Sequence, residues 1–316
     1  MLSSDMASVN ELILERMQSD VPLIPQLAGY LIAAGGKRIR PLMTLASTRL
    51  FDGETPRPFR LAAAVEFIHT ATLLHDDVVD ESDQRRGQAS ANALFGNQSS
   101  VLVGDFLFSK SFELMVEDGS LDVLGILSKA SAVIAEGEVL QLSIQNCLDT
   151  TLDQYLEVIG AKTAALFAAA CEIGPVITNQ STTTRQALRD YGYNVGMAFQ
   201  IADDVLDYQS STAELGKSIG DDFKEGKMTA PVIFAYESGT PEEKDFWKRT
   251  FENKMATDAD LATAQNLIKT HVADLRTLAL AQDYVKKAQG NLSALQDSPM
   301  KSTLMALAEF ALARKK

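Results

Sequence analysis

The chain has 316 residues, of which 46% are hydrophobic and 22% are charged, and its formal net charge is -13. This composition is typical of a globular protein, and the excess of acidic residues argues against nucleic acid or an anionic membrane as a general partner. No apolar run approaches the roughly 18 residues that a membrane-spanning helix needs. The two cysteines, Cys147 and Cys171, are too few for a disulfide framework or a cysteine-rich zinc site. No signal or transit peptide is visible, so we expect a cytoplasmic protein.

The spacing of the prolines predicts long helices along most of the chain. No proline lies between Pro58 and Pro175, or between Pro175 and Pro231, and proline interrupts helix interiors. The same stretches are rich in good helix formers, and no glycine-rich nucleotide motif or hairpin turn between alternating strands is found. Predicted breaks lie near residues 35–36, 52–58, 87–98, 118–119, 174–175 and 216–226. We predict an all-α protein made of a single domain, residues 1–316.

The first chemically distinctive segment is a basic loop that leads into a helix, Gly35-Gly36-Lys37-Arg38-Ile39-Arg40-Pro41. Arginine offers a planar fork of donors for phosphate oxygens, and lysine offers a point charge. Taken alone, such a cluster is more simply explained as solubilising surface charge. Its meaning depends on the acidic motifs that follow it.

The next segment, from about Leu61 to Asp80, has an unusual helical face. At 100° per residue, five side chains fall within about 80° of one another. They are Val65, His69, Thr72, Asp76 and Asp80. An amphipathic helix normally places its acids opposite its apolar face. Here two carboxylates lie on the same side of the helix as the apolar residues, at its C-terminal end.

A looser copy of this pattern occurs later in the chain. Residues 68–80 and residues 195–207 are both apolar helical runs that end in Asp-Asp-x-x-Asp. The first and third acids lie one helical turn apart, and their mutual repulsion is relieved by a hard cation such as Mg²⁺, which takes oxygen ligands and shares them with phosphates. One copy is as well explained by a solvated acidic helix end. Two copies favour two facing helices that hold Mg²⁺ around a diphosphate.

Further basic residues accompany the acidic motifs. Arg85-Arg86-Gly87 follows the first motif, Lys162-Thr163 is predicted to open the apolar helix 164–170, and Lys217 and Lys227 flank residues 221–223. Each cluster alone is ordinary surface charge. Together with both acidic motifs, they favour a phosphate-binding site.

The ordered set of motifs resembles the trans-polyprenyl (all-trans isoprenyl) diphosphate synthase family, over roughly Ala34 to Ile233. The motifs are Gly-Gly-Lys-Arg-x-Arg-Pro, Asp-Asp-x-x-Asp-x4-Arg-Arg-Gly, Lys-Thr, Phe-Gln-x-x-Asp-Asp-x-x-Asp and Gly-Asp-Asp-Phe-x-Glu-Gly-Lys. The resemblance implies an isoprenoid-synthase-type helical bundle around a deep central cavity, acting as a homodimer. It also implies two substrates, isopentenyl diphosphate and an allylic diphosphate of the farnesyl or geranylgeranyl type. The implied cofactor is Mg²⁺, three ions when the allylic diphosphate is bound.

The resemblance assigns roles to individual residues. Metal ligands would be Asp76, Asp80, Asp203 and Asp207, with Asp77 and Asp204 in support. Isopentenyl diphosphate would be bound by Lys37, Arg40, His69 and Arg86. The allylic diphosphate would be bound by Arg85, Lys162, Thr163, Gln200, Lys217 and Lys227. The catalytic set would comprise Asp76, Asp77, Asp80, Lys162, Thr163, Gln200 and Asp203, with Thr163 and Gln200 near the developing allylic cation.

Product length is expected to depend on the helix that carries the first acidic motif. Short-chain members of the family usually have an aromatic residue one turn or slightly more before the acids, where this chain has Ala71 and Thr72. Both are small, so the resemblance is to synthases that make chains of about 40 to 50 carbons for quinone tails. An alternative is that these positions are small only because another helix packs there.

Other functions are compatible with parts of the sequence. A short-chain farnesyl or geranylgeranyl diphosphate synthase is the nearest alternative. A class I terpene cyclase usually carries a different second metal motif, and a non-catalytic subunit of a heteromeric synthase is expected to lack acids or basic residues that are all present here. A helical scaffold with surface carboxylates would not need two such motifs. The favoured prediction is a catalytic long-chain synthase.

Overall fold

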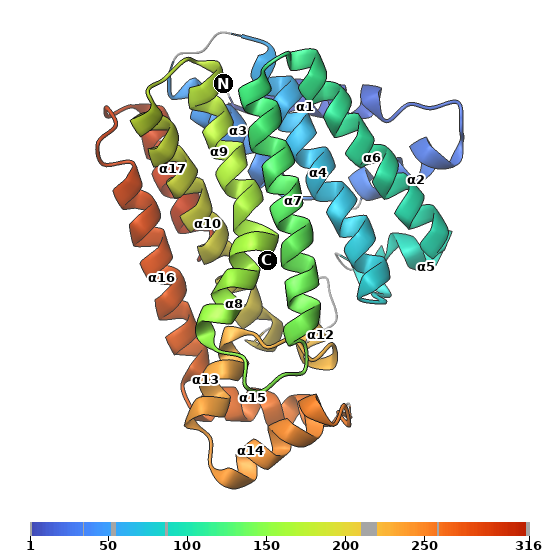
Figure 1. Ribbon diagram of the computed structural model, residues 1–316, viewed down its shortest axis with the longest axis vertical. Helices are drawn as coiled ribbons and strands as arrows, with labels where there is room; N and C mark the ends of the chain where they lie inside the picture. The colour runs from blue at the N-terminus through green and yellow to red at the C-terminus, as the bar shows by residue number, and fades with distance from the viewer. Residues whose placement is uncertain are drawn as a thin grey trace. The chain divides into compact units, whose positions relative to one another are not determined.

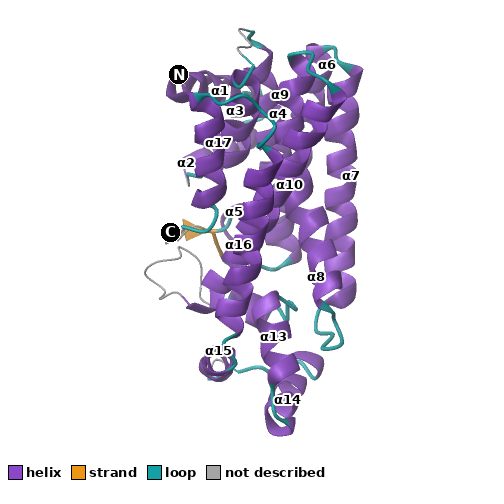
Figure 2. Cartoon of the chain, turned by 90° about the vertical axis from the view of Figure 1, so that its left-hand side faces the viewer, coloured by secondary structure: helices purple, strands orange, loops and turns teal. Residues whose placement is uncertain are grey.

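The computed structural model of the chain describes residues 2–33, 35–51, 55–85, 88–209, 220–257 and 259–313. The described residues are predominantly helical, with one short pair of strands (Figure 2). The predicted all-α fold is confirmed. No helix among these residues is both long and apolar enough to span a membrane.

The chain consists of two compact units that are each built from separate stretches of sequence. The first comprises Met1–Ser131, Leu166–Gly192 and Asn291–Ala306, and the second comprises Ala132–Ala165, Tyr193–Gly290 and Leu307–Lys316. Several helices, among them α7 (Leu121–Ile144) and α10 (Thr182–Gln209), contribute residues to both units.

The first unit is organised around α4 (Arg57–Val79), which contacts α1 (Leu2–Arg16), α3 (Ile39–Arg49) and α6 (Asn97–Asp118). Helices α4 and α6 run side by side in Figure 1. Gly104 lies at their contact, and a Cβ atom there would lie 2.3 Å from Nε2 of His75, so the His75 side chain would have to move. The first unit also contains α2 (Leu23–Ala33), α5 (Ala91–Phe95) and the antiparallel strands β1 (Gln84–Arg85) and β2 (Gln88–Ala89). The short hairpin of β1 and β2 was not predicted from the sequence.

The second unit has an aromatic core. The rings of Phe223, Trp247 and Phe251 pack edge to face, with centroids 5.6 to 6.4 Å apart, a favourable geometry for aromatic rings. Around them lie α8 (Leu152–Ile159), α12 (Asp221–Lys224), α13 (Ala230–Ser238), α14 (Pro241–Trp247), the π-helix η2 (Lys248–Glu252), α15 (Asp260–Thr270) and α16 (Ala273–Asn291). Helix α17 (Pro299–Phe310) ends the described helices.

Two details of the predicted helices were wrong. Residues Gly174 and Pro175 do not break the chain but lie inside α9 (Ala165–Ile177). Pro175 lies in the last turn of α9 and has no amide hydrogen to donate to the carbonyl oxygen of Cys171. Gly174 serves packing, since a Cβ atom on it would lie 2.4 Å from Ser47. Lys162 and Thr163 do not open α9 either. They lie in a π-helical turn, η1 (Gly160–Ala164), that joins α8 to α9.

Candidate active site

The first acidic motif lies where α4 ends. Asp76 and Asp80 are partly exposed, whereas the side chain of Asp77 is only 1% exposed. Asp80 is the C-cap of the helix, and its amide donates to the carbonyl oxygen of Asp76 at 2.8 Å. The helix therefore presents the carboxylates of Asp76 and Asp80 one turn apart. The carboxylate of Asp77, between them in sequence, is buried inside the first unit.

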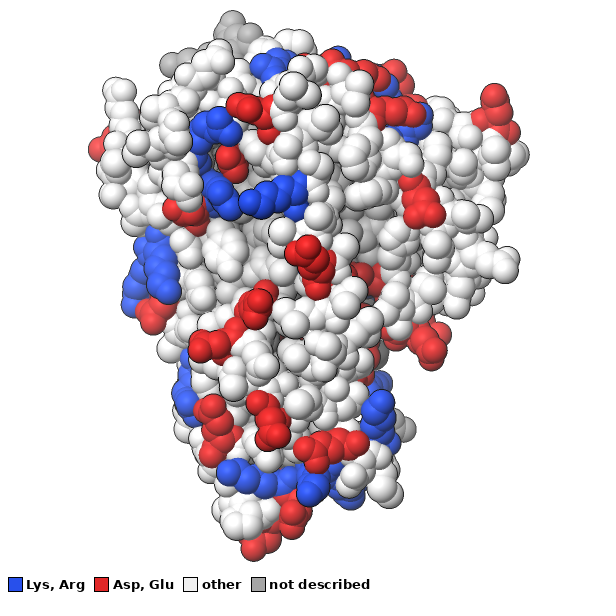
Figure 3. Space-filling model, viewed as in Figure 1, with Lys and Arg blue, Asp and Glu red and all other residues white. Residues whose placement is uncertain are grey.

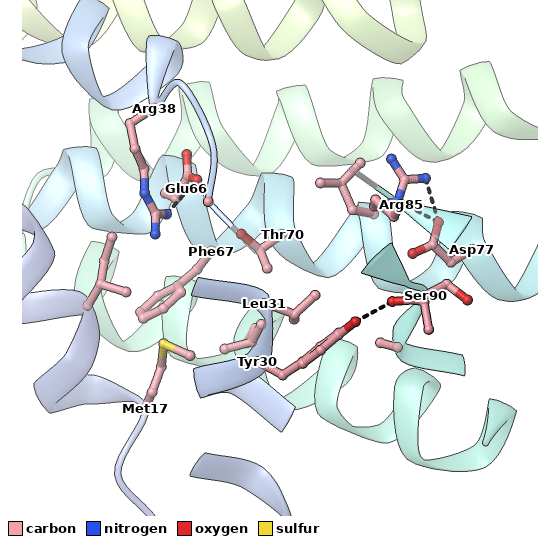
Figure 4. Close-up of a pocket in the computed structure, with 16 residues that line it drawn as sticks. Met17, Tyr30, Leu31, Arg38, Glu66, Phe67, Thr70, Asp77, Arg85 and Ser90 are labelled. Atoms are coloured by element: carbon pink, nitrogen blue, oxygen red, sulfur yellow. Dashed lines mark hydrogen bonds and ion pairs between the residues drawn. The ribbon is translucent and has the colours of Figure 1, made fainter. Parts of the chain in front are cut away.

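The buried carboxylate of Asp77 is paired with Arg85, from strand β1. Nε of Arg85 donates to Oδ1 of Asp77 at 2.6 Å (Figure 4). Burial alone would lower the pKa of Arg85, but the hydrogen bond and the charge of Asp77 raise it above its ordinary value. Such charge-assisted contacts are the stronger class of hydrogen bond. This pair fixes the start of the β1–β2 hairpin on the last turn of α4.

A second cluster of the first unit contains Arg40 and His69. Nη1 of Arg40 lies 3.1 Å from Nε2 of His69, and its guanidinium carbon lies 4.3 Å from the ring centre of the fully buried Phe167. Stacking on the ring orients the guanidinium plane. Arg40 and His69, which the sequence assigns to the same substrate, therefore lie next to each other. Lys37, in the loop before α3, is exposed.

Arg38 belongs to a separate pocket on the neighbouring face of α4. Its Nη1 donates to Oε1 of Glu66 at 2.6 Å, and both side chains line a pocket that also includes Tyr30, Thr70 and Asp77 (Figure 4). Arg38 takes a left-handed backbone conformation, with φ of 48°, just before α3 begins. This pocket is compact, and its charged groups are already paired with each other.

The second acidic motif lies on α10 and has the same pattern of exposure. Asp203 and Asp207 are partly exposed, and Asp204 is 4% exposed. A carboxylate oxygen of Asp207 also accepts from the amide of Asp222, at 3.2 Å, which ties the motif to α12. Each motif therefore has two partly exposed acids one turn apart and a buried acid between them.

The buried Asp204 accepts two hydrogen bonds. Tyr155 donates its hydroxyl to Oδ2 at 2.6 Å, and Gln200 donates its amide nitrogen to Oδ1 at 2.8 Å. Burial and the charge of Asp222 raise the pKa of Asp204 well above its usual range, and these two hydrogen bonds oppose that rise. Burial also raises the pKa of Tyr155, which remains a hydrogen-bond donor.

Basic and polar residues of the second unit lie on the π-helical turn and after α12. Nζ of Lys162 lies 2.7 Å from Glu138 of α7, and Thr163 donates to Oε1 of Gln200 at 2.8 Å. Lys227 pairs with Glu225. The close packing of η1 on α7 requires Gly137, because a Cβ atom there would lie 2.8 Å from the amide nitrogen of Lys162. π-Helical turns are rare and frequently occur at functional sites.

The sequence as a whole matches the model of the polyprenyl synthetase family over residues 21–268. The chain belongs to this family. It is 43% identical to octaprenyl diphosphate synthase of Escherichia coli (strain K12), over 99% of this chain and 96% of that protein.

Two solved structures of polyprenyl synthases are similar over nearly their whole length. One is a polyprenyl synthase from Caulobacter crescentus CB15, complexed with calcium and isoprenyl diphosphate, with a TM-score of 0.97 and 52% identity over 99% of this chain and 96% of that one. The other is a decaprenyl diphosphate synthase from Rhodobacter capsulatus, with a TM-score of 0.94 and 51% identity over 100% and 97%. The predicted class, a prenyltransferase of the long-chain all-trans polyprenyl diphosphate synthase type, is confirmed by this similarity.

The structure of this polyprenyl synthetase adds residues that the sequence did not reveal. Glu138, Tyr155, Phe167 and Glu225 each contact a predicted site residue. Glu138, Tyr155 and Phe167 lie outside the quoted motifs, whereas Glu225 is the glutamate of the last motif, to which the sequence assigned no role. His75 and His271, for which the sequence suggested no partner, lie 3.2 Å from the carbonyl oxygen of Val101 and 2.8 Å from Glu243. Two predicted site residues, Arg86 and Lys217, lie outside the described residues.

Proposed function

We propose that this polyprenyl synthetase condenses isopentenyl diphosphate head to tail onto a farnesyl or geranylgeranyl type of allylic diphosphate. The product would be an all-trans chain of about 40 to 50 carbons, the lengths of octaprenyl and decaprenyl groups. The observation that carries this proposal is the full-length similarity to long-chain synthases, together with two acidic motifs of matching exposure. A chain of this length would serve as the tail of a quinone.

The proposed metal is Mg²⁺, and its proposed ligands are Asp76, Asp80, Asp203 and Asp207. The donor chemistry fits, because all four are partly exposed carboxylates arranged in pairs one helical turn apart. No group of three or more acidic, histidine or cysteine side chains forms a complete metal site within the part of the chain that is described. This fits Mg²⁺, which typically takes one or two carboxylates and completes its shell with water and substrate phosphates. Three ions would bind together with the allylic diphosphate.

Bound Mg²⁺ would neutralise the diphosphate so that it can leave. The residues of the chain then have two tasks. Lys37, Arg40, His69 and Arg86 hold isopentenyl diphosphate, and Arg85, Lys162, Lys217 and Lys227 hold the allylic diphosphate, where positive charge stabilises the negative charge that grows on the leaving group. The ion pairs of Arg85, Lys162 and Lys227 with carboxylates support this role, because they hold the cations in place before substrate arrives.

Carbon–carbon bond formation follows ionisation of the allylic C–O bond. The terminal alkene carbon of isopentenyl diphosphate attacks the allylic carbon, and a proton leaves the neighbouring carbon to restore a double bond. The departing diphosphate is the proposed base. Thr163 and Gln200 present neutral oxygen dipoles near the developing cation, and apolar walls exclude the water that would quench it.

The proposed assembly is a homodimer. Its support is the outer face of α6, where Leu102 and Val116 are 66% and 67% exposed and Val101 and Phe112 add to the apolar surface. A face of this kind on a charged protein is typical of an interface. Leu102→Asp combined with Val116→Asp should give a monomer in sedimentation velocity at micromolar concentration. An unchanged sedimentation coefficient would exclude this face.

We also propose that residues 1–316 form one domain and that the enzyme is cytoplasmic.

The test of the proposed function is turnover. The full chain is incubated with labelled isopentenyl diphosphate, farnesyl diphosphate and Mg²⁺, and the dephosphorylated product is resolved by reversed-phase chromatography. We expect products of about 40 to 50 carbons. Accumulation of products of about 15 to 20 carbons would establish the short-chain alternative. No product without an added second protein would favour the subunit of a heteromeric synthase.

A further inference from the structure

A buried chain of hydrogen bonds in the second unit ends at a residue with no assigned role. Thr163 donates to Oε1 of Gln200 at 2.8 Å, and Nε2 of Gln200 donates to Oδ1 of Asp204 at 2.8 Å. The hydroxyl of Tyr155 donates to Oδ2 of the same carboxylate at 2.6 Å. The side chains come from α8, η1 and α10, so the relay connects three helical segments of one unit.

The ionised form of Asp204 leaves a single arrangement for Gln200. An ionised carboxylate accepts hydrogen bonds and does not donate them, so the amide nitrogen of Gln200 faces Asp204, as the structure shows. Its carbonyl oxygen must then face Thr163, and the hydroxyl hydrogen of Thr163 is directed at that oxygen. Asp204 therefore determines which way the amide is turned, and Gln200 determines where the Thr163 hydroxyl points.

Burial makes this arrangement hard to replace. Tyr155, Asp204 and Thr163 are 3%, 4% and 6% exposed, whereas Gln200 is partly exposed. Water therefore has little access to Oδ2 of Asp204, and Tyr155 is the side chain that donates to it. In a buried polar network, the loss of one donor leaves an acceptor unsatisfied and weakens the hydrogen bonds of the remaining members.

We propose that Tyr155 is a positioning residue for the reaction. It holds the carboxylate of Asp204, which in turn fixes the Gln200 amide and the Thr163 hydroxyl at the place where the allylic cation develops. This inference rests on the proposed function, in which Thr163 and Gln200 lie beside that cation. It also assigns Asp204, the buried acid of the second motif, to orientation and not to metal binding.

The first experiment compares Tyr155→Phe with the wild type. The phenylalanine keeps the ring and removes the donor, so kcat should fall about tenfold while KM for isopentenyl diphosphate changes less than about twofold. Tyr191→Phe is the matched control, because the buried hydroxyl of Tyr191 donates to the carbonyl oxygen of Leu304 at 2.7 Å in the other unit. The control should lose thermal stability and keep its kcat. A normal kcat in Tyr155→Phe would overturn the proposal.

The decisive measurement is a double-mutant cycle with Gln200→Ala. If Tyr155 acts through Gln200, then Tyr155→Phe should lower kcat by less than about twofold in the Gln200→Ala background. A purely structural role for Tyr155 would give the same tenfold loss in both backgrounds and would overturn the proposal.

A second pair of variants does not depend on Tyr155→Phe being folded. Asp204→Asn can still accept from Gln200 and can donate to the oxygen of Tyr155, so its kcat should stay within about threefold of the wild type, while Asp204→Ala should lose about tenfold or more. Equal losses in both variants would contradict the positioning role. A wild-type protein that makes no prenyl product would instead refute the proposed function, so the two failures are distinguishable.

Discussion

Adjacent aspartates within one motif have different surroundings, and the difference is visible residue by residue. Asp76 is partly exposed at the end of α4, whereas Asp77 is buried against Arg85. The same contrast separates Asp203 from the buried Asp204. Exposed acids can approach a cation, and buried acids organise their neighbours.

This contrast predicts that Asp76→Ala mainly affects turnover and that Asp77→Ala mainly affects stability. Asp76→Ala should abolish turnover, because it removes a proposed metal ligand, and should leave stability unchanged or slightly raised through relief of repulsion between acids. Asp77→Ala should lower the free energy of unfolding by about 3 kcal/mol, since Arg85 would remain largely buried without its carboxylate. Urea unfolding and a turnover assay measure the two effects. Near-normal turnover of Asp76→Ala at saturating Mg²⁺ would refute the metal assignment.

At the scale of single elements, α4 presents two neighbouring faces with different environments. Val65, His69 and Thr72 share the face that ends in Asp76, whereas Glu66 and Thr70 face the pocket of Arg38. Thr72, on the first of these faces, is partly exposed, whereas Ala71, about 100° round the helix from Thr72, is 1% exposed. The two positions proposed to set product length therefore differ in the space around them.

A ring at either position should shorten the product to about 15 to 20 carbons if the growing chain passes beside that position. Thr72→Phe should do so in a stable protein, while Ala71→Phe should also lose about 1–3 kcal/mol of stability through overpacking. Thr70→Phe is the matched control on the neighbouring face and should leave product length unchanged. Chromatography of the products and thermal unfolding test both points. Full-length product from folded Thr72→Phe would exclude position 72 from the path of the chain.

The π-helical turn η1 depends on a glycine in another helix. A side chain at Gly137 of α7 would collide with Ala161 and with the backbone of Lys162. Gly137→Ala should therefore displace Lys162 and Thr163 and lower both stability and kcat, despite the better helix propensity of alanine.

The control for this prediction lies on the same helix. Gly125 is exposed, and a Cβ atom there would meet nothing within 4 Å. Gly125→Ala should raise stability by up to about 1 kcal/mol and leave kcat unchanged. Equal effects of the two substitutions on kcat and thermal unfolding would show that the contact of Gly137 with η1 contributes neither to turnover nor to stability.

The whole chain has a formal net charge of -13, and acidic and basic side chains are intermixed on the face drawn in Figure 3. Many of the acids are paired, and the pairs make stability depend on pH. The hydrogen bond from Arg249, at 2.6 Å, is the main reason that the pKa of Asp260 is lowered well below its usual range. A lowered pKa in the folded state contributes stability above the unfolded pKa of about 4, and this contribution is lost as the pH falls towards the folded value.

Asp260→Asn should therefore cost about 1 kcal/mol at pH 7, a value kept small because Arg249 is 40% exposed. The cost should shrink as the pH drops below about 4, because the wild type then loses the same contribution. Asp297→Asn is the control, since Asp297 is 98% exposed beside Lys301 and should leave stability nearly unchanged. Urea unfolding between pH 3 and pH 7 covers the range. A cost of Asp260→Asn that stays constant across this range would contradict the assignment.

The amino-acid sequence by itself determined the helical fold, the paired acids and the basic clusters of this polyprenyl synthetase. Helix formation and the spacing of Asp76 and Asp80 follow from local rules, namely proline placement and a period of 3.6 residues. The ordered motifs were specific enough to indicate the family. They are short and nearly contiguous, so their chemistry can be read without knowing what lies beside them.

Only the tertiary structure decided which acids are buried and what holds the site residues. Tyr155 meets Asp204 from 49 residues away, and Arg40 lies over the ring of Phe167. The π-helical turn, with Lys162 and Thr163, depends on the close approach of Gly137 from another helix. Neighbouring residues of one helix point in directions 100° apart, so Asp76 and Asp77 acquire different surroundings that depend on distant segments. Periodicity gives the direction of a side chain along its own helix, and packing against other helices determines what it meets there.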